Sequence, residues 1–184
     1  ELNAPLLLGQ SALFKLGDYS IKGNKLIIQN SIKNKYEKEM EEAYEWINKA
    51  ISSHNIEKDS IHINHFFSEL YEAPMTGYIL VGHKKKTVNN EKTGEAFFIK
   101  LNEVTKVYFE QSTEISNVYN LVIEVNEGGD GIILTRTDSE SMFKTYAYVI
   151  ELHHLNDLFK ERLLKAIQHL LANNKSHSKE TQKF

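Results

Sequence analysis

The chain contains no cysteine, no long hydrophobic run and no familiar catalytic signature, and each absence narrows what it can do. Without cysteine among its 184 residues, it can form no disulfide, Cys-ligated zinc site or thiol nucleophile. Its longest apolar runs, such as residues 4–8, are far shorter than the ~20 residues that a membrane-spanning helix needs. The G-x-S-x-G and G-x-G-x-x-G patterns are also missing. The sequence therefore predicts no transmembrane segment and no cofactor, and a binding protein rather than an enzyme.

Composition and charge are those of an ordinary globular domain. Hydrophobic residues make up 41% of the chain and charged residues 26%, which is usual for soluble proteins. The formal net charge is −3, from 22 basic and 25 acidic residues, so no overall field attracts nucleic acid. Because the first residue is Glu1 rather than Met, a removed signal peptide is one explanation, and we expect an exported protein.

Hydrophobic periodicity predicts helices before and after a strand-rich region. Residues 34–51 and 156–172 each carry apolar side chains at helical spacing, and Asn156 or Asp157 can cap the second helix. Residues 61–71 fit a strand at Ile61 and Ile63, but their larger apolar set shares one helical face, so we expect a short helix there.

Two-residue periodicity predicts antiparallel strands elsewhere. Residues 19–30 should form a hairpin around Gly23, whose conformational freedom suits a tight turn. The glycine-rich stretch 127–131 is best explained as another turn. Six further strand-like runs are expected at 78–81, 96–101, 105–110, 121–125, 131–136 and 146–152.

This order of elements predicts an α+β protein with a single domain: a strongly curved antiparallel sheet or barrel of six to seven strands, closed by a C-terminal amphipathic helix. It resembles the pleckstrin-homology-like fold, in which a helix plugs an open barrel. That resemblance covers residues 77–172. It leaves 1–76 as an N-terminal hairpin and helical region packed with it, and 173–184 as a polar tail.

The same order of elements is also similar to a second fold, and this resemblance covers nearly the whole chain. In the helix-grip or START-like fold, the order is β-α-α-β6-α, and the last helix lies in the curved sheet over a cavity. The two resemblances imply different sites, because a plugging helix fills the interior and a gripping helix covers a pocket.

The spacing His62-x-x-His65-x-x-x-Glu69 is typical of metal ligands. On a helix these three side chains would lie along one side, and imidazole and carboxylate are normal zinc ligands. Exposed polar residues on an amphipathic helix explain the same pattern, and we favour that interpretation.

Three other groups are candidates for ligand binding. Histidine at the end of the last expected strand could hold a ligand or respond to pH. Clustered lysines could bind phosphate oxygens, as in lipid-binding members of the pleckstrin-homology group, although a solvated hairpin tip explains them as well. Aromatic residues of the last strand could line a cavity or an exposed binding face. The candidate residues are Lys84, Lys85, Lys86, Tyr146, Tyr148, His153 and His154.

Three functions follow from these patterns. The first is a non-enzymatic module that recognises a protein or peptide through a sheet edge or an aromatic face. The second is a carrier of a small apolar ligand in a cavity under the C-terminal helix. The third is a metal-dependent enzyme that uses His62, His65 and Glu69. The sequence does not indicate the oligomeric state.

Overall fold

The computed structural model describes residues 19–23, 25–28, 31–73, 77–137 and 139–181. The chain divides into two compact units, Glu1–Met40 and Glu41–Phe184. In the first unit, β1 (Tyr19–Lys22) pairs antiparallel with β2 (Lys25–Ile28), as predicted. Gly23 has a φ of 61° in this hairpin, a conformation that glycine adopts without strain.

The helix α2 (Ser31–Ser52) confirms the prediction for residues 34–51. In the second unit its apolar side contributes Ile47, Ala50 and Ile51 to the core, all of them buried. No helix among the described residues is long and apolar enough to cross a membrane.

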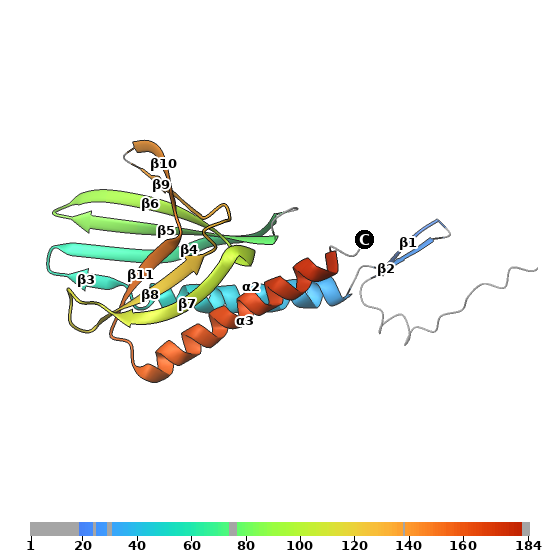
Figure 1. The fold of residues 1–184 in the computed structure, drawn as a ribbon. Helices are drawn as coiled ribbons and strands as arrows, with labels where there is room; N and C mark the ends of the chain where they lie inside the picture. The colour runs from blue at the N-terminus through green and yellow to red at the C-terminus, as the bar shows by residue number, and fades with distance from the viewer. Residues whose placement is uncertain (1–18, 24, 29–30, 74–76, 138, 182–184) are drawn as a thin grey trace, which may run out of the picture. The chain divides into compact units, whose positions relative to one another are not determined.

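The larger sheet of the second unit is antiparallel throughout and has the strand order β10-β9-β6-β5-β4-β3 (Figure 1). Its centre is the long hairpin of β5 and β6, which turns at Asn89 and Asn90, both with positive φ. Asparagine tolerates this conformation better than most residues. The strands are β3 (Ile56–Lys58), β4 (Ile61–Ala73), β5 (Gly77–Val88), β6 (Glu91–Lys100), β9 (Ile132–Arg136) and β10 (Ser139–Thr145).

A second sheet has the order β11-β8-β7, and its strands run obliquely across those of the first (Figure 1). The short 3-10 helix η1 (Leu101–Glu103) carries the chain from β6 into this sheet. Where the sheets face each other, Gly82 lies directly under the Phe97 ring, with no room for a side chain of its own. The strands are β7 (Val104–Gln111), β8 (Val118–Val125) and β11 (Ala147–His153).

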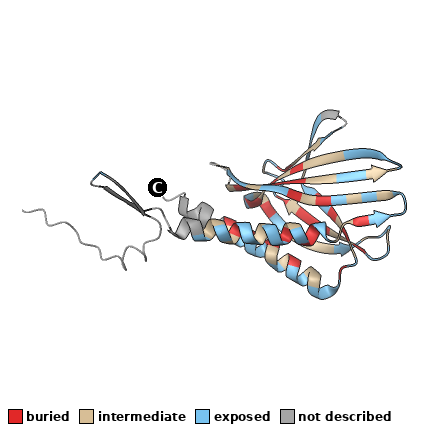
Figure 2. Cartoon of the chain, turned by 180° about the vertical axis from the view of Figure 1, so that it is seen from behind, coloured by how far each residue is buried: buried red, intermediate tan, exposed pale blue. Residues whose placement is uncertain are grey.

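The C-terminal helix α3 (Asp157–Thr181) packs on β7, η1 and β5. Its start is capped as expected, because Asn156 Oδ1 accepts a hydrogen bond of 2.8 Å from the Phe159 amide. Leu163, Ile167 and Leu170 are buried, so the predicted apolar stripe is confirmed there, whereas Leu158 is 60% exposed. Figure 2 shows the buried positions on the sides of the helices and strands that face the interior.

Three expectations for individual elements are wrong. Residues 61–71 are part of the strand β4 rather than a short helix. The strand β10 was not predicted, and it raises the strands between Gly77 and His153 from six to seven. The closing helix runs on to Thr181, through most of the expected polar tail.

The fold class is confirmed at the coarser level. The described part of the second unit is α+β, with nine antiparallel strands, β3 to β11, and a C-terminal helix. The strands do not form a closed barrel, because they separate into two sheets. The START-like order also fails at its second helix, since β4 occupies that place in the chain.

Candidate functional site

A row of polar residues crosses the inner face of the larger sheet. His65 on β4 is paired with Lys84 on β5, Lys84 with Glu95 on β6, and Glu95 with Arg136 on β9. Residues paired in this way point to the same side of a sheet. His65 is fully buried, so this side is the inner one.

The polar row borders the aromatic core directly. Tyr148, on β11 of the facing sheet, packs on Phe97 in a tilted arrangement at 4.2 Å and meets His65 edge to face at 6.5 Å between ring centroids. Its hydroxyl donates a hydrogen bond of 3.3 Å to Glu95 Oε1. Burial, and then the negative charge of Glu95, raise the pKa of Tyr148, so this hydroxyl keeps its proton.

His65 is the most unusual polar residue of the core. It has no exposed surface, and neither ring nitrogen has a hydrogen-bond partner among the described residues. Burial, followed by the nearby charge of Lys84, lowers the pKa of His65 to about 3. Its ring is therefore neutral at physiological pH.

A cationic pocket opens beside this row, with a volume of about 260 Å³. Lys84 and Lys86 lie two residues apart on β5 and face the same side, because side chains alternate along a strand. Glu95 Oε2 lies 3.5 Å from Arg136 Nε, and Glu151 Oε2 lies 3.8 Å from Lys84 Nζ. The pocket is lined by Lys84, Lys86, Thr93, Gly94, Glu95 and Arg136.

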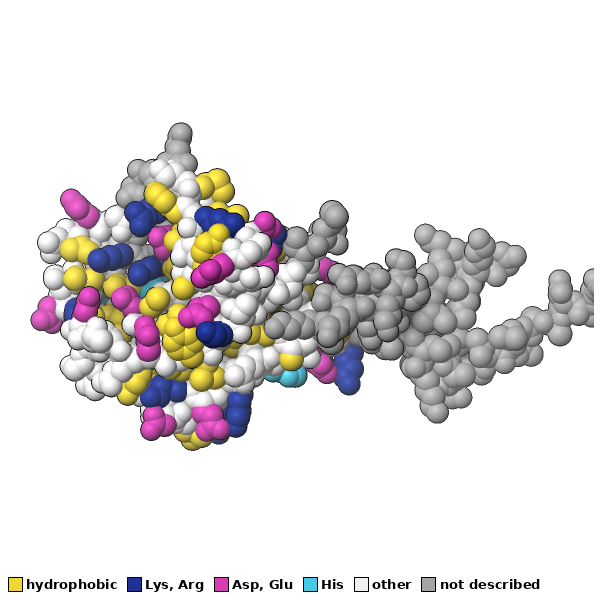
Figure 3. Space-filling view, in the orientation of Figure 1, with side chains coloured by type: hydrophobic (Ala, Val, Ile, Leu, Met, Phe, Trp, Pro, Cys, Tyr) yellow, Lys and Arg dark blue, Asp and Glu magenta, His cyan; other side chains and the backbone are white. Residues whose placement is uncertain are grey.

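Lys85 lies on the opposite, outer face of the same sheet. Its Nζ is 5.1 Å from the centre of the Phe66 ring, which also stacks on His83 at 5.3 Å. The three consecutive lysines, which the sequence suggests as one ligand-binding cluster, are thus divided between the two faces of the sheet. Figure 3 shows acidic, basic and apolar side chains interspersed over the face in view, without a large region of one sign.

The three residues of the predicted metal site are not brought together. On the strand β4, His62 is exposed and His65 buried, because positions three apart face opposite sides. Glu69 is also exposed, beyond a register shift in β4. Among the residues that the structure describes, no group of three or more histidine or acidic side chains could share a metal ion.

The two histidines at the end of β11 form a structural corner. The His153 amide donates to His54 O at 2.9 Å, and His54 Nδ1 donates to His153 O at 3.0 Å. His154 turns the chain with a φ of 54°, and its ring lies 3.7 Å from that of His153. Burial and then the charge of His154 lower the pKa of His153.

Tyr146 does not share the face of Tyr148. It precedes β11 and is exposed, with the ammonium group of Lys144 5.3 Å from its ring centre. Of the predicted ligand-binding residues, only Lys84, Lys86 and Tyr148 lie around one feature, the polar row and its pocket.

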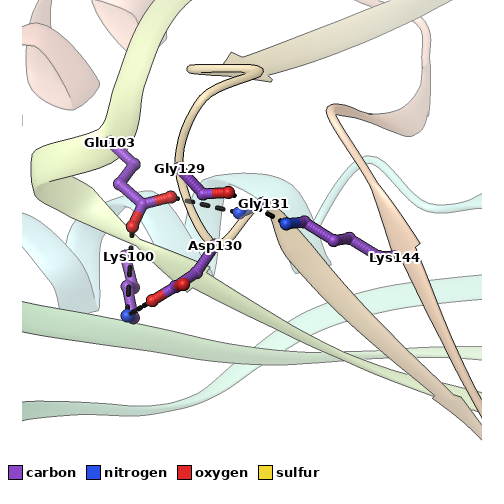
Figure 4. A network of polar contacts seen from close by, with 6 residues as sticks. All are labelled: Lys100, Glu103, Gly129, Asp130, Gly131 and Lys144. Carbon is purple, nitrogen blue, oxygen red and sulfur yellow. Dashed lines mark hydrogen bonds and ion pairs between the residues drawn. The ribbon is translucent and has the colours of Figure 1, made fainter.

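The glycine-rich turn between β8 and β9 is held by an internal lysine (Figure 4). Lys100 binds Asp130 and lies 3.9 Å from Glu103, and the other oxygen of Glu103 accepts a bond of 3.1 Å from the Gly131 amide. Lys144 donates to Gly129 O at 2.9 Å. These contacts confirm that the stretch is a turn, and the Asp130 carboxylate is already engaged by Lys100.

A second surface feature is the β7–α3 groove, which has a volume of about 490 Å³. Its floor is mostly apolar, with Val107 from the sheet and Leu171 and Ala172 from the helix. Tyr108 donates a bond of 2.9 Å to Glu124, which also faces Lys106 at 3.5 Å. The lining residues are Val104, Thr105, Lys106, Val107, Tyr108, Gln168, Leu171 and Ala172.

The space under α3, where a carrier would hold its ligand, is nearly filled. Its volume is about 20 Å³, room for about one water molecule and far below the ~300–1,000 Å³ of ligand pockets. Ile167 and Leu170 of the helix meet Leu80 and Ile99 of the sheet there. A small apolar ligand would fit only if α3 moved away.

No protein-family model, no curated protein and no solved structure matches this chain. Its candidate sites therefore depend on the geometry alone. Sequence reasoning missed Glu95 and Arg136, which are separated from Lys84 along the chain, and it missed the helix side of the groove. Alternation along β5 was a usable signal, since it places Lys84 and Lys86 together and Lys85 apart.

Proposed function

We propose that the second unit is a protein-interaction module that binds an extended peptide as an added strand along β7. The peptide's side chains would occupy the β7–α3 groove. A sheet with an open edge offers unpaired N–H and C=O groups to such a peptide, and adjacent pockets select its side chains. The single observation that carries the proposal is this groove lying beside a terminal strand.

The β7 edge differs from the other sheet edges in its backbone, although α3 packs on the same strand. No described group outside β8 hydrogen-bonds to the backbone of residues 105–111. By contrast, β3 is only three residues long, β10 has an irregular register, and the end of β11 is bonded to His54. Proteins usually blunt exposed edges by such devices, so the open β7 edge suits a partner.

The groove has the chemistry of a peptide site. Its volume of about 490 Å³ falls in the range of ~300–1,000 Å³ that is usual for binding pockets. Val107, Leu171 and Ala172 provide apolar contacts, and Lys106 and Gln168 stand at its polar border. We therefore expect the bound peptide to alternate apolar residues, which face the groove, with polar ones.

The remaining expectations are consistent with this proposal. A pleckstrin-homology-like arrangement would place the C-terminal helix beside a sheet edge, as the proposal requires. The carrier and metal-enzyme hypotheses stay predictions without a supporting cavity or metal cluster among the described residues.

Peptides selected from a random displayed library provide the test. We expect selected peptides to slow hydrogen exchange of the β7 amides. Ala172→Trp should fill the groove and weaken binding by about ten-fold or more. Leu158→Trp, at an exposed position of the same helix outside the groove, is the matched control. Selected peptides that leave the β7 amides unprotected, or that lose equal affinity in both variants, contradict the proposal.

A further inference from the structure

The cationic pocket combines positive groups from two separate strands at one place on the inner face. Lys84 and Lys86 come from β5, and Arg136 comes from β9, two strands away in the sheet order. The sheet register fixes their relative positions, because Lys84, Glu95 and Arg136 lie in one row. The site therefore depends on regular strand pairing and not on a mobile loop.

The acidic residues around the pocket do not occupy all the hydrogen-bond donors of its lysine and arginine side chains. Arg136 contacts Glu95 through Nε, at 3.5 Å, and its guanidinium group lies over the Phe143 ring, 5.1 Å from the ring centre. In the part of the chain that the structure describes, no acidic group holds its terminal guanidinium nitrogens. Glu95 also accepts the Tyr148 hydroxyl. Lys84 reaches Glu151 only at 3.8 Å, which is longer than a hydrogen bond. Among the described residues Lys86 has no ion pair, so the pocket keeps an excess of positive charge.

The base of the pocket lies against the protein interior. Glu95 and Lys84 are mostly shielded, with 19% and 29% of their side chains exposed. Beyond them come the buried His65 and the packed rings of Tyr148 and Phe97. Charges that interact at such a partly dry site attract each other more strongly than in open water.

We propose that the cationic pocket binds a small oxyanion, the phosphate or carboxylate group of a ligand. The Arg136 guanidinium end would bind two of its oxygens, and the ammonium groups of Lys86 and Lys84 would bind from β5. Planar guanidinium groups suit this two-point contact. Glu95 and Glu151 hold the cations in place, and their negative charges favour a ligand with a single anionic group over a polyanion.

This site is independent of peptide binding at β7. It lies on the larger sheet, and it shares no lining residue with the β7–α3 groove. Failure of one proposal therefore leaves the other intact.

Paired lysine variants of the full chain test the proposal. Titration with inorganic phosphate and with acetate at physiological salt, followed by NMR shifts of β5 and β9 amides, gives dissociation constants. Lys86→Met and Arg136→Met should each weaken binding by about ten-fold or more, the usual value of a charge-assisted hydrogen bond. Lys85→Met removes the same charge from the outer face of the same strand and should leave binding unchanged.

Each outcome decides the proposal. Binding of phosphate, of acetate or of both, with the loss confined to the Lys86 and Arg136 variants, supports an oxyanion site and identifies the preferred group. If neither anion binds saturably, the proposal is overturned. An equal loss in Lys85→Met also overturns it, because this result would show diffuse attraction by surface charge.

Discussion

At the scale of single residues, the buried imidazole of His65 is an energetic cost to the folded state. A buried polar atom without a hydrogen bond costs about 1–3 kcal/mol, and no group in the described part of the chain bonds either ring nitrogen of His65. The nearby Lys84 opposes protonation, so the ring cannot gain stability by becoming charged. His65 is therefore held in place by the packing around it, chiefly the edge-to-face contact with Tyr148.

We predict that His65 makes the protein sensitive to acid. Its pKa is about 3 in the folded state, against about 6.5 in an unfolded chain. Between these values the unfolded state binds more protons, so stability is lost as the pH falls from about 6.5 to about 3. In this interval the free energy of unfolding falls by up to about 1.4 kcal/mol per pH unit.

Urea unfolding of wild type and His65→Leu at pH 7 and pH 4.5 measures this contribution. The variant should match or exceed wild-type stability at pH 7, since it removes unpaired nitrogens without leaving a large cavity. It should also lose less stability on acidification. Equal losses in the two proteins would show that other groups cause the acid sensitivity.

At the scale of elements, β4 shows how tertiary contacts override a local pattern. Its backbone pairs with β5 along almost its whole length. On the other side β3 covers only its first residues, and asparagine side chains from the end of α2 and from the loop after it take over. Asn48 bonds both the N–H and the C=O of Phe67, at 2.9 and 2.8 Å, and Asn55 accepts from the His65 amide. A helix at 61–71 could make none of these bonds.

We predict that Asn48→Ala destabilises the protein by about 2 kcal/mol, because two backbone groups of β4 lose their partner at a partly buried edge. Urea unfolding at pH 7 measures the change. Asn64→Ala, at an exposed position of β4, is the control and should change stability by less than about 0.5 kcal/mol. Similar effects of the two substitutions would mean that Asn48 does not secure the strand.

At the scale of the whole second unit, the two sheets face each other over the aromatic core and are joined at one pair of edges by a hydrogen-bonded seam. The seam is the reciprocal bonding of His54 with His153, which joins the end of β11 to the loop before β3. The His54 ring also packs on Phe159 of α3, with ring centroids 4.3 Å apart. Neither the β7–α3 groove nor the cationic pocket is lined by a residue of this seam.

We predict that His54→Ala weakens this seam. The loss of the bond from Nδ1 to His153 O and of the contact with Phe159 should destabilise the protein by about 1–2 kcal/mol. Hydrogen exchange of the His153 amide should become faster, which separates local opening from global unfolding. His62→Ala, at an exposed histidine of β4, should change neither quantity, and a comparable effect there would argue against the seam.

The sequence by itself determined the elements whose signals are local. Helical spacing predicted α2 and the buried stripe of α3, Asn156 predicted the cap, and alternation with turn residues predicted most strands and the turn that Lys100 holds. Each of these signals depends on neighbours a few residues away. For this reason the α+β class and the closing helix were predictable.

Only the tertiary structure decided how these elements meet. The strand state of residues 61–71 depends on Asn48 and on pairing with β5. The cationic pocket depends on sheet register, which brings Arg136 to the row of Lys84 although they are far apart in the chain. Register and sheet packing are long-range properties, set by which apolar faces bury each other, and no local pattern of residues encodes them.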